Sequence, residues 1–557
     1  MEKNTNSINF VALGGQDEIG CNFYCLIFKQ EIFIFDVGAK LPIKNKVGVN
    51  YVVANFDFLK RNKTKIQAIF ISKYSEEHCG ALHFFLTTLE LEKTVKIYGS
   101  ELIIFILKKT AWKKNFNFLA IAPKEIITFK EIKIEAFSTI TSFPFSLGFA
   151  VYTPLGTVIY TGKFIFKQAK NKIFNFDLNH LLEISKKDKN LLFLGSCLGV
   201  ERKGFTNPNH EAKNKIMQIV ACKPKNIVFV ILINDIFHII EFLKVLKNLE
   251  TYQIGIENKI LLFIFKFLFI KFKLFNDIFE NIKNISEIDH NKNSIIIICE
   301  NENLLYKKLL LIANFQDKKV KISKNDLVIL AAPPKIGKEL NYADILDEFA
   351  RNDVEVCYFK QDEIWSMCAA KEDLKLLYSI FKSVFFVPVN GFYKSFIAAS
   401  NAISSNFENS HPIILDNFQR LNISKVNDQY KYEIKNINSK KNLIFFNKNK
   451  NNSLITTNIL LEREILSTEG VLIVSLCLDK KTKKLLSSID VQMRGIVYIE
   501  DYKKQQKIIE DLIIEILKEK NQLKIQELRK EIKKNLYQYL NKNFAKKSII
   551  LVFVNEI

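Results

Sequence analysis

The feature that most constrains the fold is a change of pattern near residue 208. Before it, short β-rich segments alternate with turns and helical stretches. From about Pro208 to Phe359 the chain alternates strand and helix, with buried strands expected at Ile227–Ile233, Ser294–Cys299 and Leu327–Ala331. We therefore predict a doubly wound, parallel α/β insert within a larger mixed α/β domain.

Further strands are predicted on both sides of the insert, where β-branched and aromatic residues gather. The segments before it are Ile8–Leu13, Phe23–Phe28, Glu31–Phe35, Ile66–Ile71 and Thr157–Tyr160. After it, a helix at Lys371–Phe381 leads into a strand at Val384–Val389. The larger domain is thus expected to resume after the insert.

The last part of the chain is predicted to form a separate small α/β domain. Asn, Lys and Ser dominate from about Asn436 to Asn452, which indicates a linker. Strands are expected beyond it at Val471–Leu478, Gly495–Ile499 and Ser548–Asn555, and amphipathic helices at Asp501–Glu519 and Ile525–Asn541.

The charge of the chain suggests a polyanionic partner. Lys and Arg number 81 against 59 Asp and Glu, for a net charge of +22. Such a surface attracts nucleic acid. A second interpretation remains open, because only seven of the basic residues are Arg and the richness in Lys, Asn, Ile and Phe is what an AT-rich coding sequence would produce.

The sequence predicts a cytoplasmic protein with no membrane partner. Its first residues are polar and unlike a signal peptide. The most apolar segment, Lys259–Phe275, is interrupted by Lys266, Lys271 and Lys273, whose ammonium groups would make a membrane span costly. The nine cysteines form no framework of close pairs and are expected to be reduced thiols.

Several short motifs together resemble the ribonuclease J family. They are Leu13–Gly20, Phe35–Gly38, Thr153–Gly156, Tyr160–Gly162, Val200–Thr206, Val387–Tyr393 and Met493–Ile499, followed by the final strand. Each is weak alone, but they occur in the family's order over essentially the whole chain. The resemblance implies a four-layer αββα metallo-β-lactamase domain split by a Rossmann-like beta-CASP domain, with a small α/β C-terminal domain.

The expected boundaries follow from the resemblance and the change of pattern. The metallo-β-lactamase domain would comprise residues 1–207 and 360–435, the beta-CASP domain 208–359, the linker 436–452 and the C-terminal domain 453–557.

The resemblance also implies a site for two zinc ions, which activate water for attack on phosphorus. The family's His-x-His-x-Asp-His loop corresponds to Lys73, Ser75, Glu77 and His78, so only His78 is kept. The remaining ligand positions fall on Thr141, Lys163 and Asn390. Since an ammonium group repels a divalent cation, we expect no zinc and no catalytic residue here, although a working site would take zinc.

Other predictions concern the remains of this site. Lys163 and Glu77 are expected to form an ion pair, and Lys73 to lie at the rim, facing an RNA phosphate. The family's phosphate loop is altered too: Ser366 keeps a hydroxyl and Trp365 could stack on a base, or be a buried core indole. His78 is interpreted as a hydrogen-bonded structural residue.

We therefore predict a ribonuclease J-like protein of RNA decay or processing that lacks catalytic activity. Its expected partners are RNA and an active ribonuclease J paralogue, within a homo- or hetero-oligomer. Two alternatives remain: an active metal-dependent endo- or 5′-exoribonuclease with unorthodox ligands, and a structural partner without RNA affinity.

Overall fold

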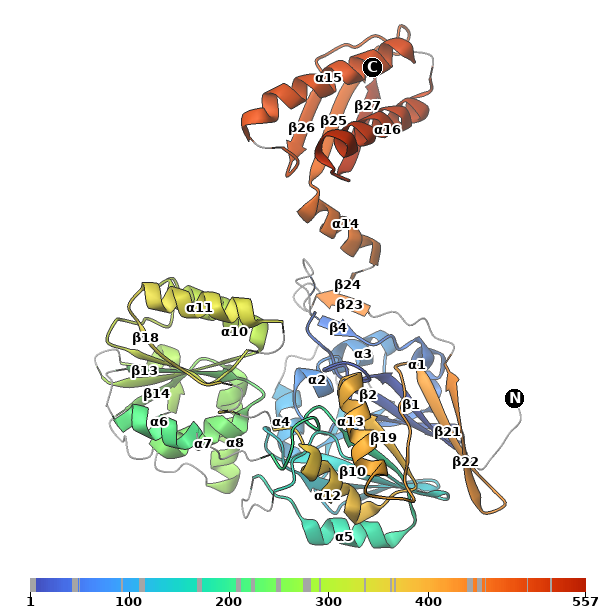
Figure 1. The fold of residues 1–557 in the computed structure, drawn as a ribbon, viewed down its shortest axis with the longest axis vertical. Helices are drawn as coiled ribbons and strands as arrows, with labels where there is room; N and C mark the ends of the chain where they lie inside the picture. Colours follow the sequence, from blue (N-terminus) through green and yellow to red (C-terminus); the bar gives the residue numbers. More distant parts are fainter. Residues whose placement is uncertain are drawn as a thin grey trace. The chain divides into compact units, whose positions relative to one another are not determined.

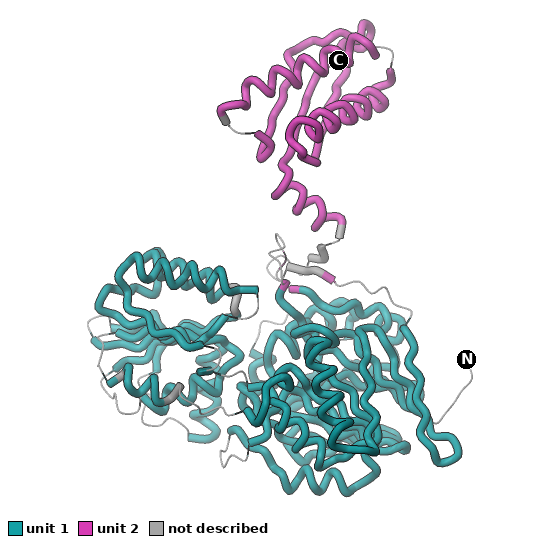
Figure 2. The backbone as a smooth tube through the Cα atoms, viewed as in Figure 1, with its two compact units in different colours: residues 1–41, 52–443 teal, residues 42–51, 444–557 magenta. Residues whose placement is uncertain are grey.

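A computed structural model of the chain was analysed. It describes residues 7–42, 49, 51–91, 94–109, 116–167, 173–206, 212–221, 226–246, 252–273, 282–289, 292–334, 337–360, 363–364, 367–437, 444–447, 453–455, 457–497, 499–520 and 523–557. The chain divides into two compact units, residues 1–41 with 52–443 and residues 42–51 with 444–557 (Figure 2).

Two mixed sheets form the centre of the first unit. One has eight strands in the order β22-β21-β1-β2-β3-β5-β6-β7, which are Gln429–Asn436, Gln419–Val426, Ser7–Gly14, Phe23–Phe28, Glu31–Phe35, Ile66–Phe70, Lys96–Gly99 and Asn117–Ala120. The other has seven in the order β20-β19-β12-β11-β10-β9-β8, which are His411–Pro412, Phe385–Val389, Asn190–Ser196, Gly156–Tyr160, Ser146–Thr153, Ile132–Thr139 and Ile126–Phe129. The short strand β4 is Tyr51–Val53.

The inner faces of the two sheets share one hydrophobic core. Alternate residues of β9, Ile132, Ile134 and Ala136, pack in one cluster with Phe33 and Phe70 of the other sheet. This alternation is what a strand with one face on a core requires.

Helices cover the outer faces of both sheets (Figure 1). α4 (Glu101–Lys109) contacts β6 and β7, whereas α12 (Lys371–Phe381) and α13 (Tyr393–Ser404) contact β12 and β19. The other helices of this domain are α1 (Asp57–Arg61), α2 (Glu76–Cys79), α3 (Leu82–Leu89) and α5 (Leu178–Lys187). The predicted four-layer αββα arrangement is confirmed.

The insert is a parallel α/β domain, as its pattern predicts. Its sheet has the order β15-β14-β16-β13-β17-β18, with strands Ile282–Asn284, Gln253–Ile256, Ser294–Glu300, Asn226–Leu232, Leu327–Leu330 and Glu355–Tyr358, and all pairings are parallel. Its helices are α6 (Ala212–Ala221), α7 (Ile236–Leu246), α8 (Lys259–Phe272), α10 (Glu302–Ala313) and α11 (Glu339–Arg351). The three buried strands expected in the insert are β13, β16 and β17.

The second unit ends in a small α/β domain. A three-stranded sheet, in the order β26-β25-β27, comprises Asp490–Arg494, Val471–Leu478 and Ile549–Glu556. α15 (Tyr502–Glu519) and α16 (Ile525–Phe544) share a hydrophobic core with this sheet, and α14 (Thr457–Thr468) precedes it.

One strand predicted in this region does not form. The prediction of a strand at Gly495–Ile499 is wrong, because β26 ends at Arg494, where Gly495 takes a φ of 71° and turns the chain out of the sheet. The predicted linker, 436–452, lies largely outside the described residues, but Ile444–Asn447 form a strand, β23, that pairs with β24 (Ser453–Ile455).

Candidate functional site

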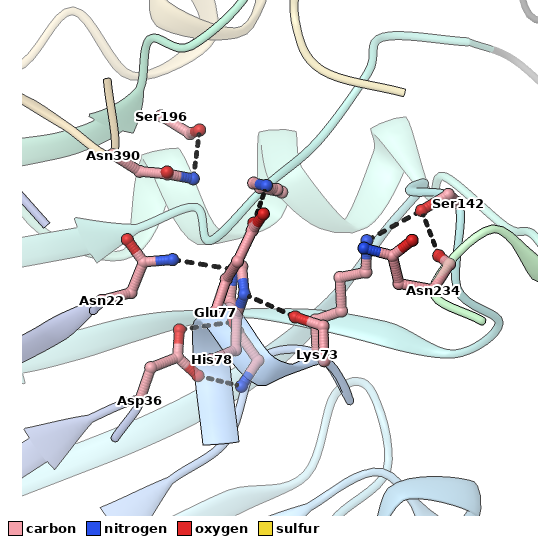
Figure 3. Close-up of polar contacts among 12 residues, drawn as sticks. Asn22, Asp36, Lys73, Glu77, His78, Ser142, Ser196, Asn234 and Asn390 are labelled. Atoms are coloured by element: carbon pink, nitrogen blue, oxygen red, sulfur yellow. Dashed lines mark hydrogen bonds and ion pairs between the residues drawn. The ribbon is translucent and has the colours of Figure 1, made fainter. Parts of the chain in front are cut away.

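The seven positions of interest follow strands of the two facing sheets, and Figure 3 labels four of them, Lys73, Glu77, His78 and Asn390. Lys73 to His78 follow β5, with Glu77 and His78 on the short helix α2, whereas Thr141 follows β9, Lys163 follows β11 and Asn390 follows β19. Lys73, Glu77 and Lys163 are in the wall of a cavity of about 620 Å³, together with Asn234 and Asp235 of the insert. The site is therefore a cleft between the αββα domain and the insert.

A close backbone contact fixes the loop that carries Glu77. Asn22 donates its backbone N–H to the carbonyl of Glu77 at 3.1 Å, and Val37 donates to the carbonyl of His78 at 2.8 Å. A Cβ on Gly38 would lie 1.9 Å from the carbonyl oxygen of Glu77, so only glycine fits there. This close contact explains why residue 38 is a glycine.

Lys163 and Glu77 form an ion pair inside the cleft. The side chains are 7% and 14% exposed, so water screens them little. Burial by itself would lower the pKa of Lys163, but the Glu77 carboxylate outweighs it and raises that pKa above its ordinary value. The predicted pair is confirmed, and Lys163 is charged at neutral pH.

Lys73 has a different environment from the one predicted. It is only 4% exposed and thus does not lie at a rim, which corrects that prediction. Its ammonium donates to Ser142 Oγ at 2.8 Å, and Ser142 Oγ in turn donates to the carbonyl of Asn234 at 2.7 Å. Burial, together with the nearby charge of Lys163, lowers the pKa of Lys73 to about 8. Ser142 orients this lysine but does not neutralise its charge.

His78 is fully buried, and both its ring nitrogens have neighbours. Nδ1 lies 3.1 Å from Ser75 Oγ, and Nε2 lies 3.5 Å from the amide nitrogen of Asn22. Burial, followed by the charge of Lys163, lowers the pKa of His78 well below its ordinary value. The ring is therefore neutral at pH 7, and these contacts are those of the structural residue predicted.

Thr141 and Asn390 are also engaged within the protein. Thr141 Oγ1 lies 2.7 Å from Ser146 Oγ and accepts the backbone N–H of Phe143 at 3.0 Å. Asn390 donates its side-chain amide to Ser196 Oγ at 3.2 Å, while its Oδ1 is buried without a hydrogen-bond partner. A threonine closing its own turn and a single amide oxygen are poor zinc ligands.

The zinc pair implied by the resemblance does not fit these side chains. Two ammonium groups stand where ligands would be, and the one imidazole is already hydrogen-bonded. In the described ranges no three His, Cys, Asp or Glu side chains gather as a metal site would require. Trp365 and Ser366, the predicted RNA contacts of the altered phosphate loop, lie outside the described residues.

Sequence reasoning assigned no role to Asp36, which is fully buried beneath the site. Its carboxylate accepts hydrogen bonds from the backbone N–H of Ser72 at 2.8 Å, from Ser72 Oγ at 2.7 Å and from the Tyr160 hydroxyl at 2.6 Å. Burial raises the pKa of Asp36 to about 7, against the lowering effect of these hydrogen bonds. The sequence did offer one signal for it, since Asp36 directly follows the predicted strand Glu31–Phe35.

The Lys163–Glu77 pair yields a stability prediction. Lys163→Met should lower the free energy of unfolding by about 1–4 kcal/mol, because the buried carboxylate of Glu77 loses the ammonium of Lys163. Adding Glu77→Gln should recover part of that loss. Urea unfolding of the two single variants and the double variant measures the coupling, and additive effects of the two substitutions would contradict a pair.

Comparison with known proteins agrees with this architecture. Residues 458–557 match the family model of the ribonuclease J C-terminal domain. The chain is 30% identical over 505 residues to "Uncharacterized protein MG423" of Mycoplasma genitalium, covering 88% of this chain and 87% of that one. It is 24% identical over 574 residues to "Ribonuclease J2" of Bacillus subtilis, covering both chains completely. A crystal structure of a protein of unknown function from Enterococcus faecalis matches 74% of this chain at 13% identity and a TM-score of 0.47. On the family model and the full-length relatives, the chain belongs to the ribonuclease J family.

Proposed function

We propose that this protein is a catalytically inactive ribonuclease J that binds RNA without cutting it, beside another ribonuclease J chain, in cytoplasmic RNA decay or processing. The observation that carries the proposal is the engagement of the former ligand positions with one another. Lys163 pairs with Glu77, and His78 contacts Ser75 and Asn22. Such a site offers nothing that would lower the pKa of a water molecule for attack on phosphorus.

The main alternative is an active, metal-dependent endo- or 5′-exoribonuclease with unorthodox ligands. It would need a second set of ligands near the cleft. Among the described residues the cleft wall has three carboxylates, and each has a cationic or histidine neighbour: Glu77 with Lys163, Glu201 with Lys394, and Asp235 with His238. These contacts favour the inactive form.

Measurements of metal content and of RNA cleavage distinguish the inactive protein from an active ribonuclease. The purified chain should hold well below one zinc per molecule by elemental analysis, and should leave a 5′-monophosphorylated RNA intact with added Zn²⁺, Mg²⁺ or Mn²⁺. An active ribonuclease J assayed in parallel shows that the substrate and buffer are competent. About two zinc ions per chain with chelator-sensitive cleavage would refute the proposal.

Lys73 is the side chain best placed to hold an RNA phosphate. It lies in the cleft wall, and no carboxylate of the described residues is within ion-pair distance of its ammonium. A buried cation that makes no direct ion pair is costly, and a phosphate oxygen would supply one, beyond the longer-range attraction of Glu77 and Asp235. Trp365 and Ser366 remain predicted contacts of the same RNA.

Replacing Lys73 should therefore weaken RNA binding. In Lys73→Met, the slope of log affinity against log salt should fall by about 0.7, the value for one phosphate contact on a single strand. Because an ammonium is charged below its pKa, this contact should be present at pH 7 and be lost as the pH rises through about 8. Fluorescence anisotropy with a labelled oligonucleotide measures both effects.

A matched variant controls for the loss of one positive charge. Lys60→Met makes the same change on the exposed face of α1, away from the cleft wall. It should keep the pH dependence and the salt slope of the unaltered protein. Equal effects of the two variants would place RNA outside the cleft, and no RNA binding at low salt would favour the purely structural alternative.

The C-terminal domain offers a surface for association with another chain. Its two long helices pack on one face of the sheet, through Leu472, Val474 and Ile550 among others. On the strand β27, Leu551 and Phe553 point the other way and are 41% and 49% exposed. We propose that a second ribonuclease J chain, the same or a paralogue, covers this apolar face.

Charges on this face should prevent association. The double substitution of Leu551 and Phe553 by Lys should reduce the oligomer mass, because two ammonium groups would be buried at the contact. Light scattering of the chain, alone and with an active paralogue, measures the mass. Leu340→Lys, at an 83% exposed position of the insert, is the control that should change nothing. An unchanged mass in the double variant would reject this surface.

A further inference from the structure

A second cavity, of about 370 Å³, lies apart from the residues of the cleft wall. Its wall combines the start of α4, the ends of β7 and β9, and α8 of the insert. The loop after β9 contributes to both cavities: Ser142 lines the cleft, whereas Phe145 and Ser146 line the second cavity. No step of the proposed RNA binding uses this space.

Three hydroxyl groups in this wall have no hydrogen-bond partner among the residues that the structure describes. They belong to Ser100, Ser138 and Thr139, which are 4%, 8% and 3% exposed. Buried polar atoms are nearly always paired with protein or ordered water, because an unpaired one keeps the full cost of leaving bulk water. Three orphan hydroxyls around one cavity indicate that their partners come from outside the chain.

The opposite wall is aromatic. Phe145 and Phe272 stack with ring centroids 5.1 Å apart and planes 23° apart. Phe267 packs against both, at 6.5 Å from Phe145 and 6.4 Å from Phe272. A cluster of rings favours a flat π-system as occupant, since stacked and edge-on contacts add to the burial of area.

The charges at this cavity disfavour an anion. Glu101 and Glu125 are in its wall, and within the described lining there is no Lys, Arg or His. Glu101 is paired with Lys271, and Glu125 accepts the backbone N–H of Ala122 at 2.9 Å. The described lining thus offers a phosphate the Glu125 carboxylate and no basic side chain, because the nearby ammonium of Lys271 is already held by Glu101.

We propose that this cavity binds a neutral nucleobase or nucleoside. The base would lie against the phenylalanine rings, and its edge, which carries both donors and acceptors, would pair with hydroxyls that can donate or accept. The volume falls in the range of small-molecule sites, roughly 300–1,000 Å³. The site is separate from the RNA cleft and does not depend on the function proposed for it.

Calorimetric titration of the full-length protein tests this proposal. The probes are adenosine, guanosine, cytidine and uridine, each titrated separately. At least one should bind saturably with a stoichiometry of one, and its 5′-monophosphate should bind more weakly because of Glu101 and Glu125. Saturable binding of none of the four would overturn the proposal.

Two variants assign the binding to this cavity. Ser138→Ala and Thr139→Val should each weaken nucleoside binding by about threefold to tenfold, the value of one neutral hydrogen bond. The unfolding temperature of the free protein should stay the same or rise, because an orphan hydroxyl has been removed. Unchanged affinity in both variants would overturn the assignment.

The chain provides matched controls. Thr157 also has a buried hydroxyl without a partner, but it lies in β11 and does not line the cavity. Thr157→Val should thus affect the free protein like Thr139→Val and leave the nucleoside affinity unchanged. Lys73→Met should also leave it unchanged, and loss of nucleoside binding in that variant would place the nucleoside in the RNA cleft instead.

Discussion

The arrangement of the site depends on the buried carboxylate of Asp36. Asp36 follows β3, and its hydrogen-bond donors are Ser72, which follows β5, and Tyr160, the last residue of β11 in the facing sheet. One side chain thereby connects the two sheets at the edge where the site loops begin. Three hydrogen bonds keep an otherwise costly buried group in place. This carboxylate therefore ties the segment after β5 to the end of β11.

The charges of the site are also balanced largely within the protein. In a site held together by metal ions, removal of the ions leaves like charges facing each other. Here Lys163 supplies the positive charge beside Glu77, and the neutral ring of His78 needs no counter-charge. Lys73 forms no ion pair with the described residues, and it is the side chain to which we assign RNA.

The fold was largely predictable because its signals are local. Runs of aromatic and β-branched residues give β2, β3 and β25 with the observed bounds, and the helix α12 also has its predicted bounds. The prediction of a strand at Gly495–Ile499 was wrong because it rested on apolar composition, which does not reveal that Gly495 takes a positive φ and starts a turn.

The site was predictable only in part. The Lys163–Glu77 pair could be predicted from the balance of charge in the site. The burial of Lys73 could not, because it depends on the distance between the insert and the αββα domain, which no local sequence pattern encodes. The cavity lined by Ser100, Ser138 and Phe267 was not predicted either, because its walls come from segments far apart in the chain.

The ion pair also limits which single substitutions the site can accept. Replacing Lys163 by aspartate would set two carboxylates side by side in a buried space, and replacing Lys73 by histidine would leave an imidazole near the ammonium of Lys163. The Lys163–Glu77 pair is thus coupled, so that no one substitution turns it into two metal ligands, and a designed metal site would need several changes made together.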